Sequence, residues 1–296
     1  MLMTFADIKR QFPHYLDLIR FSRPIGTYLL LWPTLWALWF AAKGLPDIKI
    51  LLIFSLGVFL MRSAGCAIND FADRNIDGQV KRTKDRPLVT GKITAKEALM
   101  VFVVLALVAF VLVLQLNLAT ILLSTVAVLL AASYPFMKRF HSLPQVHLGA
   151  AFAWAVPMAF TAITGDMPSP IAWLLFIATM LWTTAYDTLY GMVDREDDIK
   201  LGMKSSAILF ADKDKLIVGI LQALTVILLL IIGYLASRGW IYFTGITVAT
   251  GLFIYQQQLI KDRQPQACFK AFLNNHWFGM VVFIGLAIDY FVATIS

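Results

Sequence analysis

The chain has 296 residues, of which 59% are hydrophobic and only 15% are charged. A soluble domain typically carries about 25% charged residues, so this composition favours a protein embedded in a bilayer. The net charge of +7 does not indicate nucleic acid binding, because the basic residues stand in short gaps between apolar runs. Cys66 and Cys268 lack the spacing of a metal site and are not expected to form a structural disulfide.

Residues 1–22 predict an amphipathic cytoplasmic segment ahead of the first apolar run. Phe5, Ile8, Phe12, Tyr15 and Ile19 repeat at helical spacing, and the charged residues fall off this stripe. Such a helix can lie on the membrane surface or pack against other helices, and the sequence favours the two placements equally.

Nine apolar runs follow, each long enough to cross a hydrocarbon core of about 30 Å. We place them at residues 26–42, 48–68, 98–114, 118–135, 146–164, 170–186, 216–236, 240–259 and 277–295. The sequence therefore predicts an all-α, polytopic membrane protein with about nine transmembrane helices, in which residues 1–296 form a single domain. An odd number of spans places the two termini on opposite sides of the membrane.

Lys and Arg residues indicate the orientation of these spans. Of the 25, 21 lie in the N-terminal segment or in the gaps that follow the second, fourth, sixth and eighth runs. The other gaps hold only Lys43, Lys49 and Arg238, and Arg62 lies inside the second run. By the positive-inside rule, the N-terminus and the two long loops, residues 69–97 and 187–215, are cytoplasmic.

Two acidic stripes begin where the second and sixth runs end. If the second helix continues, Asn69, Asp73 and Asp77 share one of its faces, with Asp70 beside it. The sixth run leads into a second stripe at i, i+3, i+7 and i+11, formed by Asp187, Tyr190, Asp194 and Asp198. The pattern Asp-Arg-x-x-Asp occurs in both stripes and suggests a duplicated half.

Stacked carboxylates repel one another and are costly beside a membrane unless a cation neutralises them. The stripes offer only oxygen ligands, which favours Mg²⁺ over zinc. Because Mg²⁺ completes its shell with water and substrate phosphates, two facing stripes predict a metal-bridged diphosphate site. Two solvated helix ends are the alternative, and Glu196 and Asp197, which leave the second stripe, are expected in solvent.

Basic side chains near the stripes could bind phosphate oxygens, although each could serve membrane topology alone. The candidates are Lys84, Arg86, Lys204 and, beside Tyr134 at the end of the fourth run, Lys138. Arg62 differs from them, because a charge inside an apolar run requires an anionic partner.

These residues resemble the signatures of the para-hydroxybenzoate polyprenyltransferases of the UbiA superfamily of intramembrane aromatic prenyltransferases. The motif N-D-x-x-D-x-x-x-D matches residues 69–77, D-x-x-Y-x-x-x-D-x-x-x-D matches 187–198, and Y-x-x-x-K matches 134–138. Segments typical of the para-hydroxybenzoate branch stand at 31–37, 86–91, 186–188 and 204–207, where Ser206 replaces an expected threonine. The resemblance spans about residues 21–279.

The resemblance implies helices around a central cavity that opens to lipid, beneath a cytoplasmic cap. It implies that Asp73, Asp77, Asp194 and Asp198 hold Mg²⁺ and a polyprenyl diphosphate, with Asn69, Asp70, Asp187 and Tyr190 assisting. The implied reaction transfers the polyprenyl group to the ring carbon ortho to the hydroxyl of 4-hydroxybenzoate, releasing pyrophosphate, in ubiquinone biosynthesis at a bacterial inner membrane. Arg62 is the candidate for the substrate carboxylate or phosphate, and Asp187 for the proton acceptor.

Two other functions compete with this one. Intramembrane acids also mark ion pathways in transporters, but these usually lie near the midplane, whereas both stripes stand at cytoplasmic helix ends. Within the enzyme class, another aromatic acceptor such as a naphthoate or haem is the alternative. We expect the two substrates and the bilayer as partners, with neither nucleic acid nor an obligate protein partner.

Overall fold

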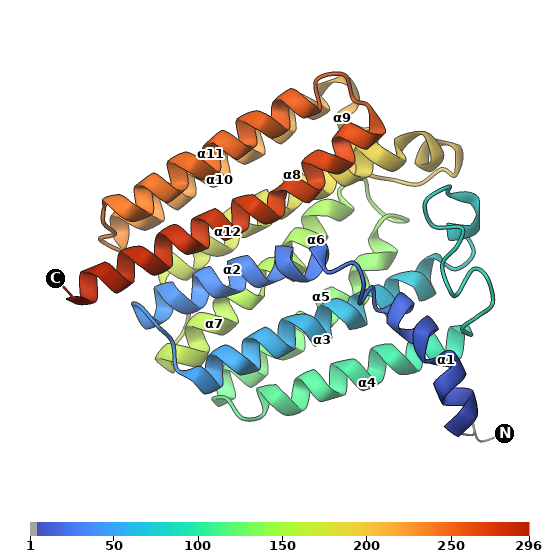
Figure 1. Ribbon diagram of the computed structural model, residues 1–296, viewed down its shortest axis with the longest axis horizontal. Helices are drawn as coiled ribbons and strands as arrows, with labels where there is room; N and C mark the ends of the chain where they lie inside the picture. The colour runs from blue at the N-terminus through green and yellow to red at the C-terminus, as the bar shows by residue number, and fades with distance from the viewer. Residues whose placement is uncertain (1–4, 296) are drawn as a thin grey trace.

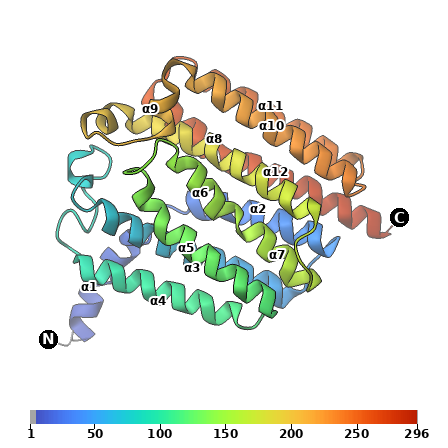
Figure 2. The same ribbon diagram turned by 180° about the vertical axis from the view of Figure 1, so that it is seen from behind.

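The computed structural model describes residues 5–295, and every regular element among them is a helix (Figures 1 and 2). The long helices are α1 (Phe5–Leu18), α2 (Ile25–Ala42), α3 (Ile48–Asp73), α4 (Ala95–Val113), α5 (Leu118–Met137), α8 (Pro170–Lys200), α10 (Asp214–Leu235), α11 (Trp240–Leu259) and α12 (Pro265–Ile295). The shorter ones are η1 (Asp77–Gln79), α6 (Pro144–Ala153), α7 (Ala155–Thr164), α9 (Ser206–Phe210) and η2 (Ala211–Lys213). Each predicted apolar run corresponds to a helix, or in one case to the consecutive pair α6 and α7.

By length and hydropathy, seven segments of the described residues qualify as membrane spans, so the predicted number of nine is approximate. The two predicted runs outside this set lie in α8 and α11, which pack against the other long helices. The hydropathy of these two helices is lower because they carry more polar side chains. Several of these side chains are buried inside the protein and do not face lipid. Thr183 on α8 and Gln256 on α11 are both buried, and Gln256 accepts a hydrogen bond from Gln222 at 2.8 Å.

Short polar sequences start several of these helices. Asp47 accepts hydrogen bonds from the first backbone N–H groups of α3, and Thr94 and Glu97 form a reciprocal capping box at the start of α4. The break between α6 and α7 falls at Trp154, three residues before Pro157, whose ring cannot donate a helical hydrogen bond.

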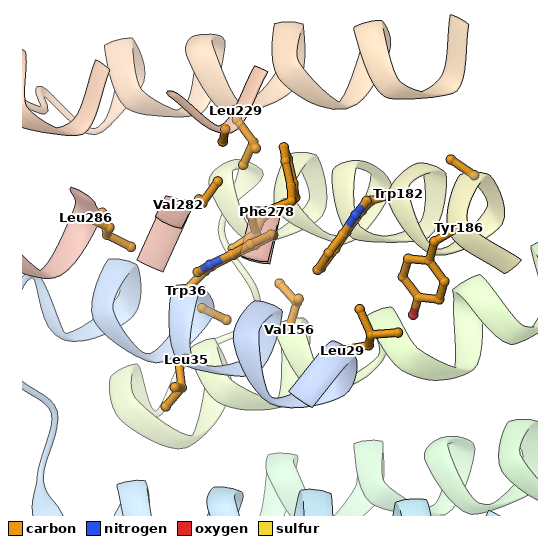
Figure 3. Close-up of a cluster of buried hydrophobic side chains, with 14 of the residues drawn as sticks. Leu29, Leu35, Trp36, Val156, Trp182, Tyr186, Leu229, Phe278, Val282 and Leu286 are labelled. Carbon is orange, nitrogen blue, oxygen red and sulfur yellow. The ribbon is translucent and has the colours of Figure 1, made fainter. Parts of the chain in front are cut away.

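An aromatic cluster at the centre of the bundle joins α2, α8 and α12 (Figure 3). Trp36 and Trp182 are fully buried and stack with their ring centroids 5.2 Å apart. The Trp182 indole donates to Asn275 Oδ1 at 2.9 Å, and the Trp36 indole donates to the backbone oxygen of Gly279 at 3.0 Å. A Cβ at Gly279 would lie within 2.8 Å of both Trp32 and Trp182, so only glycine allows this approach.

The C-terminal half of α1 packs against the bundle. Leu18 is fully buried beside Ala67 and Ala98, and the Tyr15 hydroxyl donates to Glu97 at 2.8 Å. Burial and this hydrogen bond raise the pKa of Tyr15 to about 12. Phe12 is exposed, and the side chains of Phe5 and Ile8 lie outside the described ones.

The cytoplasmic cap predicted from the sequence corresponds to one end of the molecule. The loop at 74–94, the segment around α9 and helix α1 gather there, and the C-terminus lies at the opposite end (Figure 1). Three helices run further into this end than their apolar runs predict, because α3 continues to Asp73, α8 continues to Lys200, and α12 begins at Pro265.

We predict that Gly245→Leu lowers the thermal stability of the purified protein in detergent. A Cβ at Gly245 would lie 3.1 Å from the Cα of Gly285 on α12, so a leucine must push α11 and α12 apart. Overpacking of this kind costs about 1–3 kcal/mol. Gly251→Leu on the same helix is the matched control, because its Cβ would meet nothing within 4 Å. Equal melting temperatures for the two variants would contradict the prediction.

Candidate functional site

The second acidic stripe forms on a continuous helix, as predicted. Helix α8 carries Asp187, Tyr190, Asp194 and Asp198, and all four line a small pocket of about 150 Å³ at the capped end. Glu196 is exposed and lies outside this lining, as expected for a residue off the stripe.

The first stripe is not one helical face, because the condition for it, a helix that continues through Asp77, is not met. Helix α3 ends at Asp73, the chain turns, and Asp77 begins the short helix η1. The turn leads back to the same pocket, which Asn69, Asp73 and Asp77 all line. The turn is stabilised because the Thr83 hydroxyl donates to the backbone oxygen of Asp77 at 2.7 Å and Arg86 pairs with the Asp77 carboxylate.

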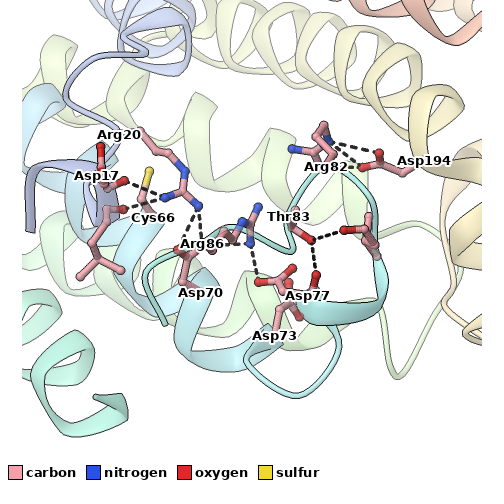
Figure 4. Close-up of polar contacts among 12 residues, drawn as sticks. Asp17, Arg20, Cys66, Asp70, Asp73, Asp77, Arg82, Thr83, Arg86 and Asp194 are labelled. Carbon is pink, nitrogen blue, oxygen red and sulfur yellow. Dashed lines mark hydrogen bonds and ion pairs between the residues drawn. The ribbon is translucent and has the colours of Figure 1, made fainter. Parts of the chain in front are cut away.

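Three of the four predicted metal-binding carboxylates are paired with cations, and Figure 4 shows two of these pairs, Asp77 with Arg86 and Asp194 with Arg82. Arg86 lies 2.6 Å from Asp77, and Arg82 donates to both carboxylate oxygens of Asp194. The third pair joins Asp73 to Lys138, which the predicted Tyr134–Lys138 element brings from the end of α5. The two acidic stripes therefore face one another across a single pocket, which the predicted cations Arg86, Lys138 and Lys204 also line.

Arg82 was not among the residues predicted for the site. Its guanidinium lies 4.5 Å from the centre of the Tyr190 ring, in addition to its contact with Asp194. Burial lowers the pKa of Arg82, but Tyr190 and Asp194 outweigh this effect and raise it overall, so the group stays charged. Lys84 is exposed and lines neither pocket, which places it away from the site. The sequence offers no signal that separates these two neighbours.

Lys204 lines the small pocket, and its Nζ donates to the backbone oxygen of Phe140 at 3.2 Å. Asp70 has a different environment from the acids of the pocket. It is 1% exposed and lies 2.7 Å from Arg20 and 2.9 Å from Arg86. Through these two contacts, Asp70 ties the segment after α1 and the 74–94 loop to α3. Arg20 was not among the residues predicted for the site.

A larger cavity of about 1080 Å³ adjoins the small pocket. The residues that line both are Asn69, Arg82, Arg86, Tyr134, Asp187 and Tyr190. Most of the remaining lining is apolar and includes Phe54 of α3, Phe110 of α4 and Met158 of α7, although Arg20, Arg62 and Asp70 also line this cavity. The shared residues make one continuous site with a polar end and an apolar end.

Arg62 lines the larger cavity but not the small pocket. Its guanidinium contacts the Cys66 thiol and packs against Gly26, where a Cβ would collide with it. In the part of the chain that the structure describes, no carboxylate pairs with Arg62. The anionic partner expected from the sequence is therefore not a protein side chain among these residues.

The predicted metal ligands do not stand as one cluster. Over residues 5–295, no three His, Cys, Asp or Glu side chains are close enough to hold one ion together. The pocket nevertheless fits Mg²⁺, which usually takes only one or two protein carboxylates. Oδ1 of Asp73 is buried without a hydrogen-bond partner, and no described cation pairs with Asp187 or Asp198. These oxygens are suitable ligands for a hard cation.

Known proteins resemble this chain over nearly its whole length. The sequence model of the UbiA prenyltransferase family matches residues 30–281. A protein of Psychromonas ingrahamii named 4-hydroxybenzoate octaprenyltransferase is 57% identical over 97% of this chain and 99% of its own. One of Colwellia psychrerythraea with the same name is 60% identical over 92% of this chain and 94% of its own.

Solved structures share the fold. A UbiA homolog from Aeropyrum pernix superposes with a TM-score of 0.79 at 25% identity, over 89% of this chain and 97% of that one. A UbiA homolog from Archaeoglobus fulgidus, bound to GPP and Mg²⁺, superposes with a TM-score of 0.69 at 19% identity, over 93% of this chain and 99% of that one.

We predict that Arg82→Ala weakens the binding of pyrophosphate with Mg²⁺ about ten- to a hundredfold, because it removes a charge-assisted donor from the pocket. Lys84→Ala, which removes a neighbouring charge outside the pocket, should change the affinity by less than about twofold. Isothermal titration of the purified protein measures both. If the two variants lose affinity equally, the cations act only through the general charge of the loop.

Proposed function

Because this chain belongs to the UbiA prenyltransferase family, we propose that it transfers a polyprenyl group from polyprenyl diphosphate to 4-hydroxybenzoate. The new bond forms at the ring carbon ortho to the hydroxyl, and pyrophosphate is released, as a step of ubiquinone biosynthesis. The observation that carries this proposal is the junction of an acidic, cation-lined pocket with a large apolar cavity. A diphosphate with a long hydrocarbon tail needs both environments next to each other.

The diphosphate occupies the small pocket in this proposal. Asp73, Asp77, Asp194 and Asp198 would hold Mg²⁺, which when bound supplies charge neutralisation for the departing pyrophosphate. The cations that line the pocket donate to phosphate oxygens, and these are Arg82, Arg86, Lys138 and Lys204. The prenyl chain lies along the apolar cavity, where it is kept from water.

The allylic cation forms where the two pockets meet. The Tyr190 ring lies there, 4.7 Å from the ring of Phe272, and these aromatic faces can stabilise a positive charge in a dry site. The phenol ring then attacks through carbon and loses a proton. Asp187 lines both pockets and is the proposed proton acceptor.

Arg62 is the proposed ligand of the 4-hydroxybenzoate carboxylate. The phosphate-binding cations line the small pocket, whereas Arg62 lines only the larger cavity. A planar guanidinium there can bind a carboxylate through two parallel hydrogen bonds.

The protein spans the membrane several times. We propose that it lies in a bacterial inner membrane with its N-terminus and both active-site loops in the cytoplasm. The asymmetry of Lys and Arg supports this orientation, and the loops that carry most of these residues gather at one end of the bundle (Figure 2).

The proposal is tested by supplying membranes that contain the protein with a polyprenyl diphosphate and a panel of aromatic acids, and by identifying products by mass. We expect a prenylated 4-hydroxybenzoate, formed with Mg²⁺ and lost in excess EDTA. If only a naphthoate or haem were prenylated, that compound and not 4-hydroxybenzoate would be the acceptor. No magnesium-dependent release of pyrophosphate with any acceptor would overturn the enzymatic function.

We predict that Asp73→Ala, Asp77→Ala, Asp194→Ala and Asp198→Ala each lower turnover at least about a hundredfold, because each removes a ligand from the charge-neutralising set. Glu196→Ala on the exposed side of α8 is the control and should keep most of the activity. Immunoblots of the membranes check that each variant accumulates. Wild-type turnover in any two of the four variants would contradict the assignment of these aspartates as Mg²⁺ ligands.

For Arg62→Lys, we expect the KM for 4-hydroxybenzoate to rise about tenfold or more, although the charge is kept, because an ammonium cannot bind a carboxylate bidentately. The KM for prenyl diphosphate should stay nearly unchanged. If the KM for prenyl diphosphate rose instead, Arg62 would be assigned to the phosphate. Unchanged kinetics with both substrates would show that Arg62 is not part of the site.

A further inference from the structure

Gln145 is an uncharged residue in the lining of the acidic pocket. It follows Pro144 in the first turn of α6 and is only 6% exposed. It lines the pocket together with Asp194 and Asp198 of α8. Its side chain therefore comes from a helix that supplies none of the acids or cations described above.

The orientation of the Gln145 amide is fixed by one hydrogen bond. Its Oε1 accepts the backbone N–H of Ser206 at 2.9 Å. Ser206 is fully buried, and its hydroxyl lies 2.7 Å from the hydroxyl of Thr188 on α8. Because the acceptor end of the amide is held in this rigid frame, its amino group must point the other way.

The amino group faces the stripe on α8. A Cβ at Gly191 would lie 3.6 Å from Nε2 of Gln145, so Nε2 packs one turn before Asp194. No acceptor among residues 5–295 is hydrogen-bonded to Nε2, and this nitrogen is not among the fully buried, unpartnered polar atoms, so it is open to the pocket that the side chain lines. A fixed amide donor that opens into a pocket and has no protein acceptor is free to donate to a ligand oxygen there.

We propose that Gln145 is a further substrate-binding residue, whose Nε2 donates a hydrogen bond to an oxygen of the diphosphate. This inference rests on the proposed function, since it assigns a ligand to the same pocket. A neutral donor suits this position, because it can bind an anionic oxygen without adding another charge to the pocket. Its fixed amide makes the hydrogen bond without a loss of side-chain freedom on binding.

The substitution Gln145→Glu separates ligand binding from a purely structural role. Glutamate has nearly the same shape and still offers an oxygen to the N–H of Ser206, so a structural role survives. It replaces the donor with an anionic oxygen that repels a diphosphate. Gln145→Leu removes both functions, and Gln79→Glu is the matched control, because it adds the same charge to the exposed surface of the cap.

The measurements are the affinity of the purified, full-length protein for pyrophosphate with Mg²⁺ by titration calorimetry, its melting temperature, and the KM of each substrate. We expect Gln145→Glu to keep the melting temperature and to bind pyrophosphate about a hundredfold more weakly, with Gln79→Glu unchanged. The KM for prenyl diphosphate should rise, and that for 4-hydroxybenzoate should not.

A mild Gln145→Glu beside a severe Gln145→Leu would overturn the inference, because the side chain would then serve only Ser206. Wild-type affinity for pyrophosphate in Gln145→Glu would overturn it as well. The proposed function is tested separately. It would fail if the wild-type protein transferred no prenyl group to any acceptor, even if pyrophosphate binding were found to depend on Gln145.

Discussion

Carboxylates at the ends of apolar helices can stay buried only where positive charges reach them, and this requirement shapes the capped end of the molecule. Asp73 is paired with Lys138 of α5, and Asp194 is paired with Arg82 of the 74–94 loop. In both pairs the cation comes from a segment far away in the sequence. The ion pairs thus fold the loops over the bundle, and the polar pocket is the space that they enclose.

Two buried aspartates hold this cap without lining the small pocket. Asp70 binds arginines on the N-terminal side of the cap, and the fully buried Asp214 binds Arg195 of α8 and Arg263 of the loop before α12. Arg195 directly follows Asp194, so this contact fixes the part of α8 that carries the second stripe. In the first stripe, Arg74 instead donates to the backbone oxygen of Phe71. The repeated Asp-Arg-x-x-Asp pattern therefore occurs in two different local structures.

Local patterns in the sequence were sufficient for the helices and for the second stripe. The length of each apolar run identified the helices, and the spacing of Asp187 to Asp198 identified one helical face. Both follow from the rise and the turn per residue of a regular helix. The turn after Asp73 could not be predicted in this way, since it is stabilised by the later Arg86. Arg82 could not be distinguished from the other cations of its loop for the same reason, since its partner Asp194 is far away in the sequence. Gln145 was not predicted because it carries no charge. Long-range contacts decide which side chains reach the pocket, and local spacing does not contain them.

The distribution of polarity along the site also separates an enzyme from a transporter. A transporter that alternates access needs polar groups near the midplane and a path toward both faces of the membrane. Here the charged lining of the cavity is concentrated toward the capped end, where Arg82 and Asp187 stand. Leu116, in the link between α4 and α5, and Met158 of α7 line the cavity away from the cap. Such a lining suits a hydrocarbon chain better than an ion, which supports the proposal that the cavity binds one end of an amphipathic substrate.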